Sequence, residues 1–273
     1  MTRIAVLQMT SGIDPARNAA TILDAMGEAR RGGAEMLFTP EMSLLLDRDR
    51  GRAAGHLGAE AYRRIVEQLQ AAAGEHGLWL SVGLPVARDD GRLANRMLVF
   101  PPGAQAPVAY DKMHMFDVAL ATGESWRESA AYAPGERVVT VPDTPAGRLG
   151  LAICYDLRFP ALFEELGRQS CDTISIPAAF TVPTGRAHWH LLLRARAVEA
   201  SAYVVAAAQV GVHEDGRTTY GHSLVVDPWG EVVLDLGGEA PGLGFAEIEP
   251  ARIADVRRQL PSLANRRPIP KST

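Results

Sequence analysis

Apolar residues along this chain follow two alternating patterns, which together predict a succession of strands and helices. Short continuous apolar runs are typical of buried strands, whereas apolar residues three and four positions apart are typical of a helix with one buried face. The runs predict strands at residues 4–9, 34–38, 78–86, 96–100, 108–110, 138–141, 148–153, 173–176, 203–208, 223–226, 231–236 and 244–248. The helical spacing predicts helices at 15–31, 59–76, 161–169 and 186–202, with a short one ending near residue 260.

Two segments of this pattern carry specific expectations. In the helix predicted at 186–202, the side chains of Leu191, Ala195 and Val198 share one face, and we expect that face to be buried. Residues 113–135 show no clear periodicity, which predicts a long loop. Loops of that length are usually functional, so this segment is a candidate part of a site.

The order of the predicted elements indicates how the chain is organised. Strands alternate with helices, and no Pro/Ser-rich linker, repeat or low-complexity segment interrupts them. This arrangement is typical of an α/β fold in which helices cover mixed sheets. We therefore expect a single domain over residues 1–273, in which residues 261–273 form a C-terminal tail with few core-forming side chains.

Composition and charge exclude several classes of protein. Hydrophobic residues make up 47% of the 273 positions, which is enough for a large core, and the net charge is -4 with no cluster of Lys and Arg. This balance argues against binding to nucleic acid or to a membrane surface. No apolar run approaches the roughly 18 residues of a membrane span, and the N-terminus has the pattern of a strand rather than a signal peptide. We expect a cytoplasmic protein.

Polar or reactive residues stand at the ends of three predicted strands: Glu41, Lys112 and Cys154. Strand ends and the loops after them are where α/β proteins form their sites. Each residue alone has a structural explanation, because Glu41 could begin a helix, Lys112 could lie in a solvated turn, and Cys154 could pack as a small core residue. The second cysteine, Cys171, has no comparable setting and is expected to be structural. Two cysteines do not form a disulfide framework in a chain of this size, and we expect both thiols to be reduced.

The three residues together favour catalysis. A free thiol has a pKa of about 8.5 and is only slightly ionised at neutral pH, so a nucleophilic cysteine needs a base or a nearby positive charge. Glu41 offers a carboxylate and Lys112 a cation, each at the end of its own strand. No Cys–His pair has a comparable placement.

The motifs around these residues resemble the nitrilase (carbon–nitrogen hydrolase) superfamily. They occur in the family's order and cover nearly the whole chain: Phe38-Thr-Pro-Glu41, Tyr110-Asp-Lys112-Met-His114, Ile153-Cys154-Tyr-Asp-Leu-Arg158-Phe-Pro160, Pro177-Ala-Ala-Phe180, Thr184-Gly-Arg-Ala-His188-Trp189, Leu193-Arg-Ala-Arg-Ala-Val-Glu199, Tyr220-Gly-His-Ser223 and Val226-Asp-Pro-Trp-Gly230. One such motif is weak evidence, but all of them in sequence are highly specific.

The resemblance implies a fold, an assembly and roles for the strand-end residues. The fold would be a four-layer α-β-β-α sandwich, which forms homodimers and in some members higher oligomers. Cys154 would be the nucleophile, Glu41 the general base, and Lys112 the cation that stabilises the tetrahedral intermediate. The family's second glutamate matches Glu128 better than the nearby Glu124.

Four further residues are candidates for contact with a substrate. Arg158 lies four positions after the nucleophile, where a guanidinium could bind a substrate carboxylate in a bidentate manner. The alternative for Arg158 is an ion pair with a neighbouring acid, Asp156 or Glu164. Tyr155 would offer its backbone N–H to the developing oxyanion, while Phe180 and Thr184 could line the same pocket.

The resemblance is closest to the Nit branch, whose members are amidases that act on ω-amides of dicarboxylates or on deaminated glutathione. The implied reaction is hydrolysis of a small-molecule amide through a thioester on Cys154. A nitrilase or an N-carbamoyl amidohydrolase would use the same three groups, and a binding or scaffold protein with an inert thiol is the non-enzymatic alternative. No His, Cys and carboxylate group has metal-ligand spacing, and no Gly-rich phosphate loop follows a strand, so we expect neither a metal nor a cofactor.

Overall fold

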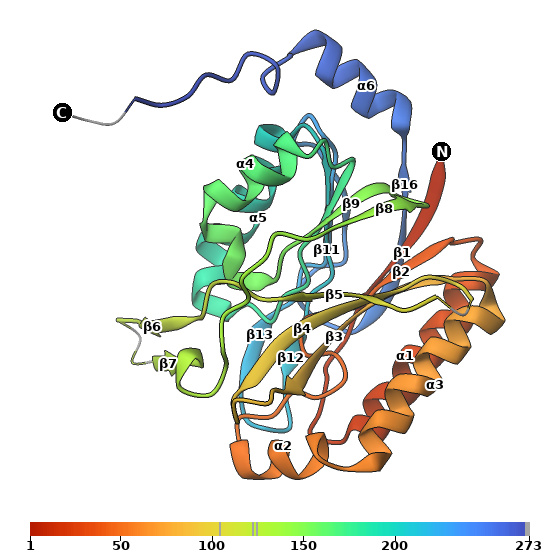
Figure 1. Cartoon of the computed structure of the whole chain (residues 1–273), viewed down its shortest axis with the longest axis vertical. Coiled ribbons are helices and arrows are strands. Elements are labelled where there is room, and N and C mark those ends of the chain that lie inside the picture. The colour runs from red at the N-terminus through yellow and green to blue at the C-terminus, as the bar shows by residue number, and fades with distance from the viewer. Residues whose placement is uncertain (104, 122, 124, 271–273) are drawn as a thin grey trace.

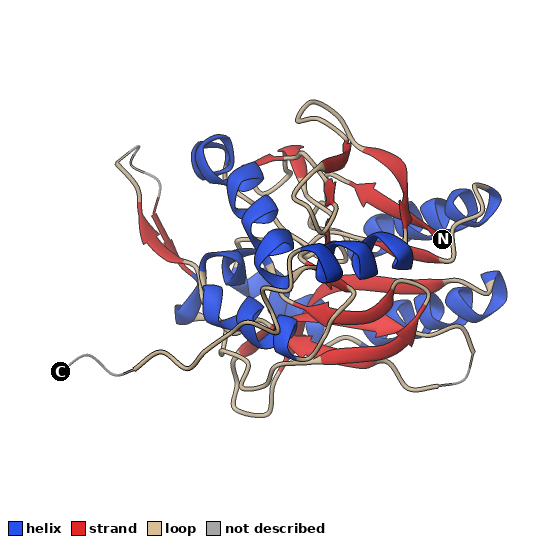
Figure 2. Ribbon diagram, turned by 90° about the horizontal axis from the view of Figure 1, so that it is seen from above, coloured by secondary structure: helices blue, strands red, loops and turns tan. Residues whose placement is uncertain are grey.

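Two mixed six-stranded sheets, each covered by helices on its outer face, form the centre of the protein (Figure 1). The computed structural model describes residues 1–103, 105–121, 123 and 125–270. In Figure 1 the layers follow one another as helix, sheet, sheet and helix, which confirms the predicted α-β-β-α sandwich. Figure 2 shows the same layers from above, with the C-terminal segment extending away from them.

The first sheet has the strand order β16-β1-β2-β3-β4-β5. Its central strands β1, β2 and β3 are parallel, whereas β4, β5 and β16 pair antiparallel to their neighbours. The strands are β1 (Thr2–Gln8), β2 (Met36–Phe38), β3 (Trp79–Ala87), β4 (Leu93–Phe100), β5 (Val108–Asp111) and β16 (Gly242–Ile248). Helices α1 (Pro15–Arg31) and α3 (Glu60–His76) pack on its outer face.

The second sheet has the order β15-β14-β11-β10-β9-β8. Strands β9, β10 and β11 are parallel, and the outer pairs are antiparallel. The strands are β8 (Thr140–Thr144), β9 (Gly147–Leu151), β10 (Thr173–Ser175), β11 (Tyr203–Ala206), β14 (Leu224–Val226) and β15 (Val232–Asp235). Helices α4 (Pro160–Arg168) and α5 (Val182–Ala200) cover it.

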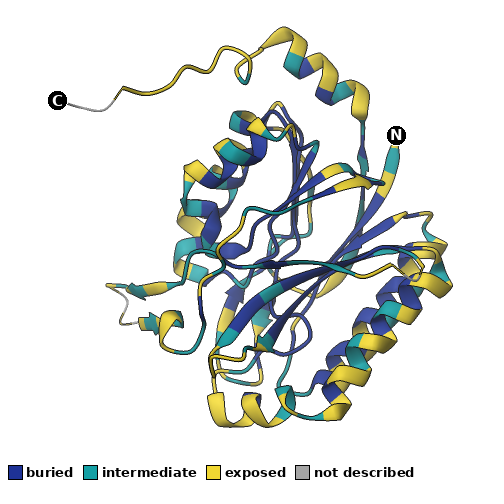
Figure 3. Ribbon diagram, in the orientation of Figure 1, coloured by how far each residue is buried: buried dark blue, intermediate teal, exposed yellow. Residues whose placement is uncertain are grey.

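The largest cluster of buried apolar side chains fills the space between the two sheets. Val6 and Phe38 of the first sheet and Leu151 and Val205 of the second are buried in one cluster. A separate cluster joins the first sheet to α1 and α3 through residues such as Ile22. Figure 3 shows these buried segments in the sheets and on the inner helix faces, and burial of their apolar surface is the main force that holds the layers together.

Helix α5 buries a different face from the one predicted. Leu191, Ala195 and Val198 are all exposed, whereas Trp189 and Leu193 are fully buried against the second sheet. The prediction was wrong because apolar and small residues lie on more than one face of this helix. Its periodicity therefore does not single out the buried side.

Several short elements were not predicted. Helix α2 (Arg50–Leu57) has little apolar pattern, because Ala53 is its only buried residue among those described. The expected loop at 113–135 contains strands β6 (Asp117–Ala119) and β7 (Ser125–Arg127) and a 3₁₀ turn, η1 (Glu128–Ala130). Strands β12 (Val210–Val212) and β13 (Thr218–Tyr220) form a second small hairpin, and η2 (Cys154–Arg158) is another 3₁₀ turn. Strands β6, β7, β12 and β13 are short and lack the continuous apolar run that made the equally short strand β2 visible in the sequence.

The C-terminal helix α6 (Pro250–Gln259) lies at one end of the sandwich (Figure 1). Its Arg257 donates hydrogen bonds to the carbonyl oxygens of Ser201 and Cys171, which anchors the helix beside the second sheet. Across the described ranges of the chain, none of the helices combines the length and the apolarity needed to cross a membrane.

Candidate active site

The three strand-end residues singled out in the sequence converge on one buried cluster. Glu41 follows β2, Lys112 follows β5, and Cys154 begins η2 after β9. All three residues are buried, with exposed fractions of 5% for Glu41, 2% for Lys112 and 8% for Cys154. Glu41 and Lys112 come from the first sheet and Cys154 from the second, so the cluster forms where the two sheets meet.

Lys112 bridges two carboxylates. Its Nζ atom lies 2.9 Å from Oε1 of Glu41 and 2.9 Å from Oε2 of Glu128. The backbone N–H of Phe116 donates to the same oxygen, Glu128 Oε2, at 2.7 Å, which further fixes this carboxylate. Glu128, the first residue of η1, thus contacts Lys112, and its role as the second glutamate stays a prediction. The alternative, Glu124, lies outside the described residues.

Asn95, near the start of β4, is a further member of the cluster that the sequence pattern did not indicate. Its Nδ2 atom donates to Glu41 Oε1 at 2.7 Å and to Glu128 Oε1 at 3.0 Å. One amide group thereby holds both carboxylates around Lys112. The only sequence signal was a buried polar residue in a largely apolar strand, and such a residue is usually hydrogen-bonded without further function.

Two further hydrogen-bond donors hold Glu41, one from the backbone and one from a side chain. The N–H of Ala179, after β10, donates to Glu41 Oε2 at 2.8 Å. The side chain of Gln209 donates from Nε2 to the backbone carbonyl of Glu41 at 3.0 Å. The base is thus held from both sheets.

Cys154 lies at a sharp turn whose backbone is held in a left-handed conformation. Its φ is 47°, which L-residues seldom adopt and which places the side chain at the edge of the sheet. The fully buried carboxylate of Asp156 fixes the turn by accepting hydrogen bonds from the Ile153 N–H, the Tyr110 hydroxyl and the His114 N–H. These bonds secure the position of the thiol.

The surroundings set the protonation states of the three groups. Burial alone would raise the pKa of Glu41, but the charge of Lys112 and a hydrogen bond with the Cys154 thiol outweigh it, so this pKa lies below its ordinary value. Burial and the Glu41 charge raise the pKa of Cys154 well above its ordinary value. Burial opposes the charge of Lys112, but Glu128 and Glu41 raise its pKa. At neutral pH the site therefore holds an ionised base, a protonated thiol and an ammonium group.

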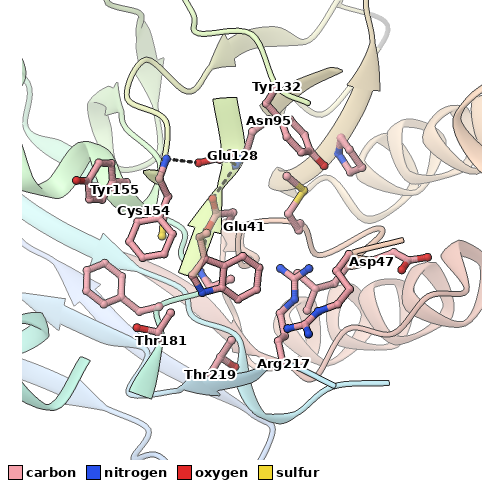
Figure 4. Close-up of a pocket in the computed structure, with 18 of the residues that line it drawn as sticks. Glu41, Asp47, Asn95, Glu128, Tyr132, Cys154, Tyr155, Thr181, Arg217 and Thr219 are labelled. Atoms are coloured by element: carbon pink, nitrogen blue, oxygen red, sulfur yellow. Dashed lines mark hydrogen bonds between the residues drawn. The ribbon is translucent and has the colours of Figure 1, made fainter. Parts of the chain in front are cut away.

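A cavity of ≈ 720 Å³ opens above this cluster (Figure 4). Tyr155, Phe180 and Thr184, which were predicted to contact a substrate, all line it, together with Glu41, Asn95, Lys112, Glu128 and Cys154. A volume of this size accommodates a ligand of several hundred daltons. The arrangement combines a thiol, a carboxylate in contact with it, and an ammonium group beside a cavity.

Arg158 does not line this cavity in the described structure. Its guanidinium lies 5.8 Å from the ring centroid of Tyr155 and 5.3 Å from that of Phe180, so it packs behind two residues of the cavity wall. Its Nη1 atom lies 3.2 Å from Nδ1 of His188. The polar contact found is thus with a histidine rather than with either of the acids considered in the sequence analysis.

One group of possible metal-binding side chains lies away from the cavity. His190 Nε2 and His222 Nδ1 lie 3.1 Å and 3.0 Å from carboxylate oxygens of Asp235. The three residues are 32 and 13 positions apart along the chain, which is why no metal-ligand spacing was visible in the sequence. Within the described ranges each histidine is hydrogen-bonded to Asp235, and the absence of a metal stays a prediction.

Comparison with known proteins gives a consistent result. The family model described as carbon–nitrogen hydrolase matches residues 3–258. The deaminated glutathione amidase of Homo sapiens is 39% identical over 270 residues, which cover 97% of this chain and 82% of the human protein. The protein of that name from Synechocystis is also 39% identical, over 267 residues that cover 96% of this chain and 97% of the relative.

Solved structures agree with these sequence relatives. The Caenorhabditis elegans NitFhit protein has a TM-score of 0.89 and 36% identity, and the match covers 97% of this chain and 65% of that longer one. Saccharomyces cerevisiae Nit3, a member of branch 10 of the nitrilase superfamily, has a TM-score of 0.84 and 26% identity over 95% of this chain and 94% of its own.

Proposed function

Because this chain belongs to the carbon–nitrogen hydrolase family, whose amidase chemistry it shares, we propose that it hydrolyses deaminated glutathione or a related ω-amide of a 2-oxo-dicarboxylate. The observation that carries the proposal is the buried cluster of Glu41, Lys112, Glu128 and Cys154 beside the cavity. The names of the relatives support the substrate, and the geometry supports a thioester mechanism.

The first step is attack of the thiol on the amide. Glu41, which is ionised and hydrogen-bonded to the thiol, takes the proton from Cys154 as the sulfur bonds to the carbonyl carbon. Negative charge then develops on the carbonyl oxygen. The Lys112 ammonium and the Tyr155 N–H at the start of η2 stabilise this charge, and loss of one such donor typically costs about 2.7–4 kcal/mol of barrier.

The second half of the reaction releases both products. Protonated Glu41 gives its proton to the amide nitrogen, and the C–N bond breaks. The amine departs, and the acyl group stays on Cys154 as a thioester. A water molecule then attacks the thioester carbon while Glu41 takes its proton. When the C–S bond breaks, Glu41 returns that proton to the sulfur, and the carboxylic acid product leaves.

Glu128 has a positioning role in this scheme. With Asn95, it holds the Lys112 ammonium at the end of the cavity and helps to keep it charged. The acyl half of the substrate packs against Phe180 and Thr184. Arg158, whose guanidinium lies against the rings of Tyr155 and Phe180, places positive charge near the carboxylate of the acyl half.

A substrate screen with a nucleophile variant tests this function. Purified enzyme is given deaminated glutathione, 2-oxoglutaramate, N-carbamoyl amino acids and simple nitriles, and the release of ammonia or amine is measured. We expect turnover of one or both 2-oxoglutaryl amides. In the Cys154→Ala variant we expect loss of turnover by at least a factor of about 1,000 with unchanged circular dichroism, because no other group can form the thioester.

Two results would contradict the proposal. Full activity of Cys154→Ala would exclude the thioester mechanism. Turnover of nitriles or N-carbamoyl compounds alone would keep the mechanism but assign the enzyme to a different substrate class.

We also propose that the enzyme is a cytoplasmic homodimer. Both cysteines are free, as expected for a reducing compartment. Leu191 and Val198 on α5 and Trp229 and Val233 near β15 are between 41% and 67% exposed. A group of exposed apolar residues on neighbouring elements is a candidate surface for self-association.

A further inference from the structure

The part of the cavity that lies away from Cys154 is rich in arginine. Arg48, Arg50, Arg127 and Arg217 all line it. Figure 4 shows Arg217 on the other side of the drawn residues from Cys154, with Glu41 between them. None of these arginines has a part in the mechanism described above.

The carboxylates near these arginines neutralise only part of their charge. Asp47, which also lines the cavity, is bound by Arg52 with contacts of 2.6 and 2.8 Å. The fully buried side chain of Asp215 is bound by Arg217 at 2.7 Å. Asp117 and Asp49 also lie near Arg127 and Arg52. Among the residues that line the cavity itself, however, four arginines and one carboxylate, Asp47, lie at this end, whereas Glu41 and Glu128 outnumber Lys112 at the catalytic end.

Arg48 and Arg217 share one aromatic neighbour. Their guanidinium carbons lie 5.3 Å and 5.2 Å from the centroid of the Trp126 ring. Contact with an aromatic ring orients a guanidinium without using its N–H groups. Nε and Nη2 of Arg217 already contact Asp215, so the subsite would use Nη1 of Arg217 together with the guanidinium of Arg48. Asp215 contacts Arg217 directly, and the charge of Arg217, its hydrogen bonds and the charge of Arg48 together lower the pKa of Asp215 despite its burial.

We propose that Arg48 and Arg217 form a subsite for a carboxylate on the leaving amine, so that the enzyme prefers N-substituted amides whose amine half is an amino acid or short peptide. This inference rests on the proposed function, because it needs the acyl half to lie at Cys154. A cleaved primary amide releases ammonia and leaves this end of the cavity empty. An amide of a dipeptide spans the cavity and places its terminal carboxylate among the arginines.

The test compares two substrates that differ only in charge at this end. One is deaminated glutathione, and the other is the same molecule with its C-terminal carboxylate replaced by a carboxamide. The readout is the ratio of kcat/KM for the two compounds. We expect the enzyme to favour the carboxylate by about tenfold or more, as expected for a charge-assisted hydrogen bond.

Arg48 is the residue to change, because it is exposed and its removal leaves no buried carboxylate without a partner. In Arg48→Gln we expect the ratio to fall at least threefold, mainly through KM, and in Arg48→Lys to be partly restored. Arg217→Lys, which keeps a charge beside Asp215, should lower the ratio as well. Arg17→Gln is the matched control, since Arg17 is an exposed arginine on α1, and it should keep the ratio of the unchanged enzyme.

The outcomes separate the subsite from the proposed function. A ratio near one in the unchanged enzyme, or an unaltered ratio in Arg48→Gln, would overturn the subsite while leaving the amidase proposal intact. Absence of turnover for both compounds, with other amides hydrolysed, would overturn the proposed substrate and this inference together.

Discussion

At the scale of single residues, the organising group of this site is the Asn95 amide. It donates to Glu41 and to Glu128 at once and so fixes the two acids on either side of Lys112. Its Oδ1 atom is buried without a hydrogen-bond partner among the described residues, which shows that the amide is oriented by the two carboxylates. Asn95 is thus a positioning residue for both the base and the cation.

Removal of this amide should change the pH dependence of the reaction. The hydrogen bond from Asn95 helps to hold the pKa of Glu41 below its ordinary value. In Asn95→Ala that pKa rises, so Glu41 becomes protonated at a higher pH than before. Because the base must be ionised to accept the thiol proton, the acid limb of kcat/KM should move to higher pH, and kcat should fall by about 10- to 100-fold.

Ser81→Ala is a suitable control for this measurement. Ser81 is a buried polar residue on the adjacent strand β3, and its hydroxyl has no partner in the described part of the chain. Its removal should leave the pH profile in place. An acid limb at the same pH in Asn95→Ala and in the unchanged enzyme would show that Asn95 does not influence the base.

At the scale of elements, the hydrophobic pattern predicted the positions of strands more accurately than the buried faces of helices. The ends of β2, β5 and β9 were visible because an apolar run stopped at a charged or reactive residue, so Glu41, Lys112 and Cys154 could be singled out. Asn95 could not, because its partners are 54 and 33 positions away. The direction of the Arg158 side chain depends on the η2 turn and on the rings of Tyr155 and Phe180. The pattern of apolar and polar residues does not predict such a direction.

The buried face of α5 leads to a stability prediction. Trp189 is fully buried, packs on Phe180 and donates from Nε1 to the His222 carbonyl at 2.8 Å. Trp189→Ala should lower the free energy of unfolding by about 3–5 kcal/mol, because it leaves a cavity beneath the helix. Urea denaturation at fixed protein concentration measures this loss.

The matched control lies on the same helix. Arg186 is exposed, and Arg186→Gln should change the free energy of unfolding by less than about 0.5 kcal/mol. Equal effects of the two substitutions would mean that the helix does not pack through Trp189.

At the scale of the whole molecule, the exposed apolar residues of α5 and the β14–β15 region are the main feature not explained by the fold of one chain. Val198 lies close to Gly230 in the β14–β15 turn, and Arg194 donates to the Gly230 carbonyl at 2.7 Å, so the two elements form one continuous surface. Burial of such a surface by a second copy would stabilise the helix that covers the active-site sheet.

Light scattering can test this assembly. The unchanged enzyme should have the mass of a dimer, and the double variant Leu191→Glu, Val198→Glu should shift toward the monomer, because it would bury charges without partners in the interface. Val212→Glu is the control, since Val212 is 73% exposed on the β12–β13 hairpin and should not affect the mass. A dimer that survives the double variant would locate the interface elsewhere.

The origin of the proposed catalytic groups at two different sheets has a consequence for the whole enzyme. Asn95 lies in the first sheet, and Glu41 and Lys112 directly follow strands of that sheet, whereas Cys154 and Ala179 follow strands of the second sheet. The thiol and its proposed base therefore meet only when the two layers are correctly aligned, so the rate of turnover depends on that alignment. A small shift of one layer relative to the other would abolish activity while leaving every helix and strand intact.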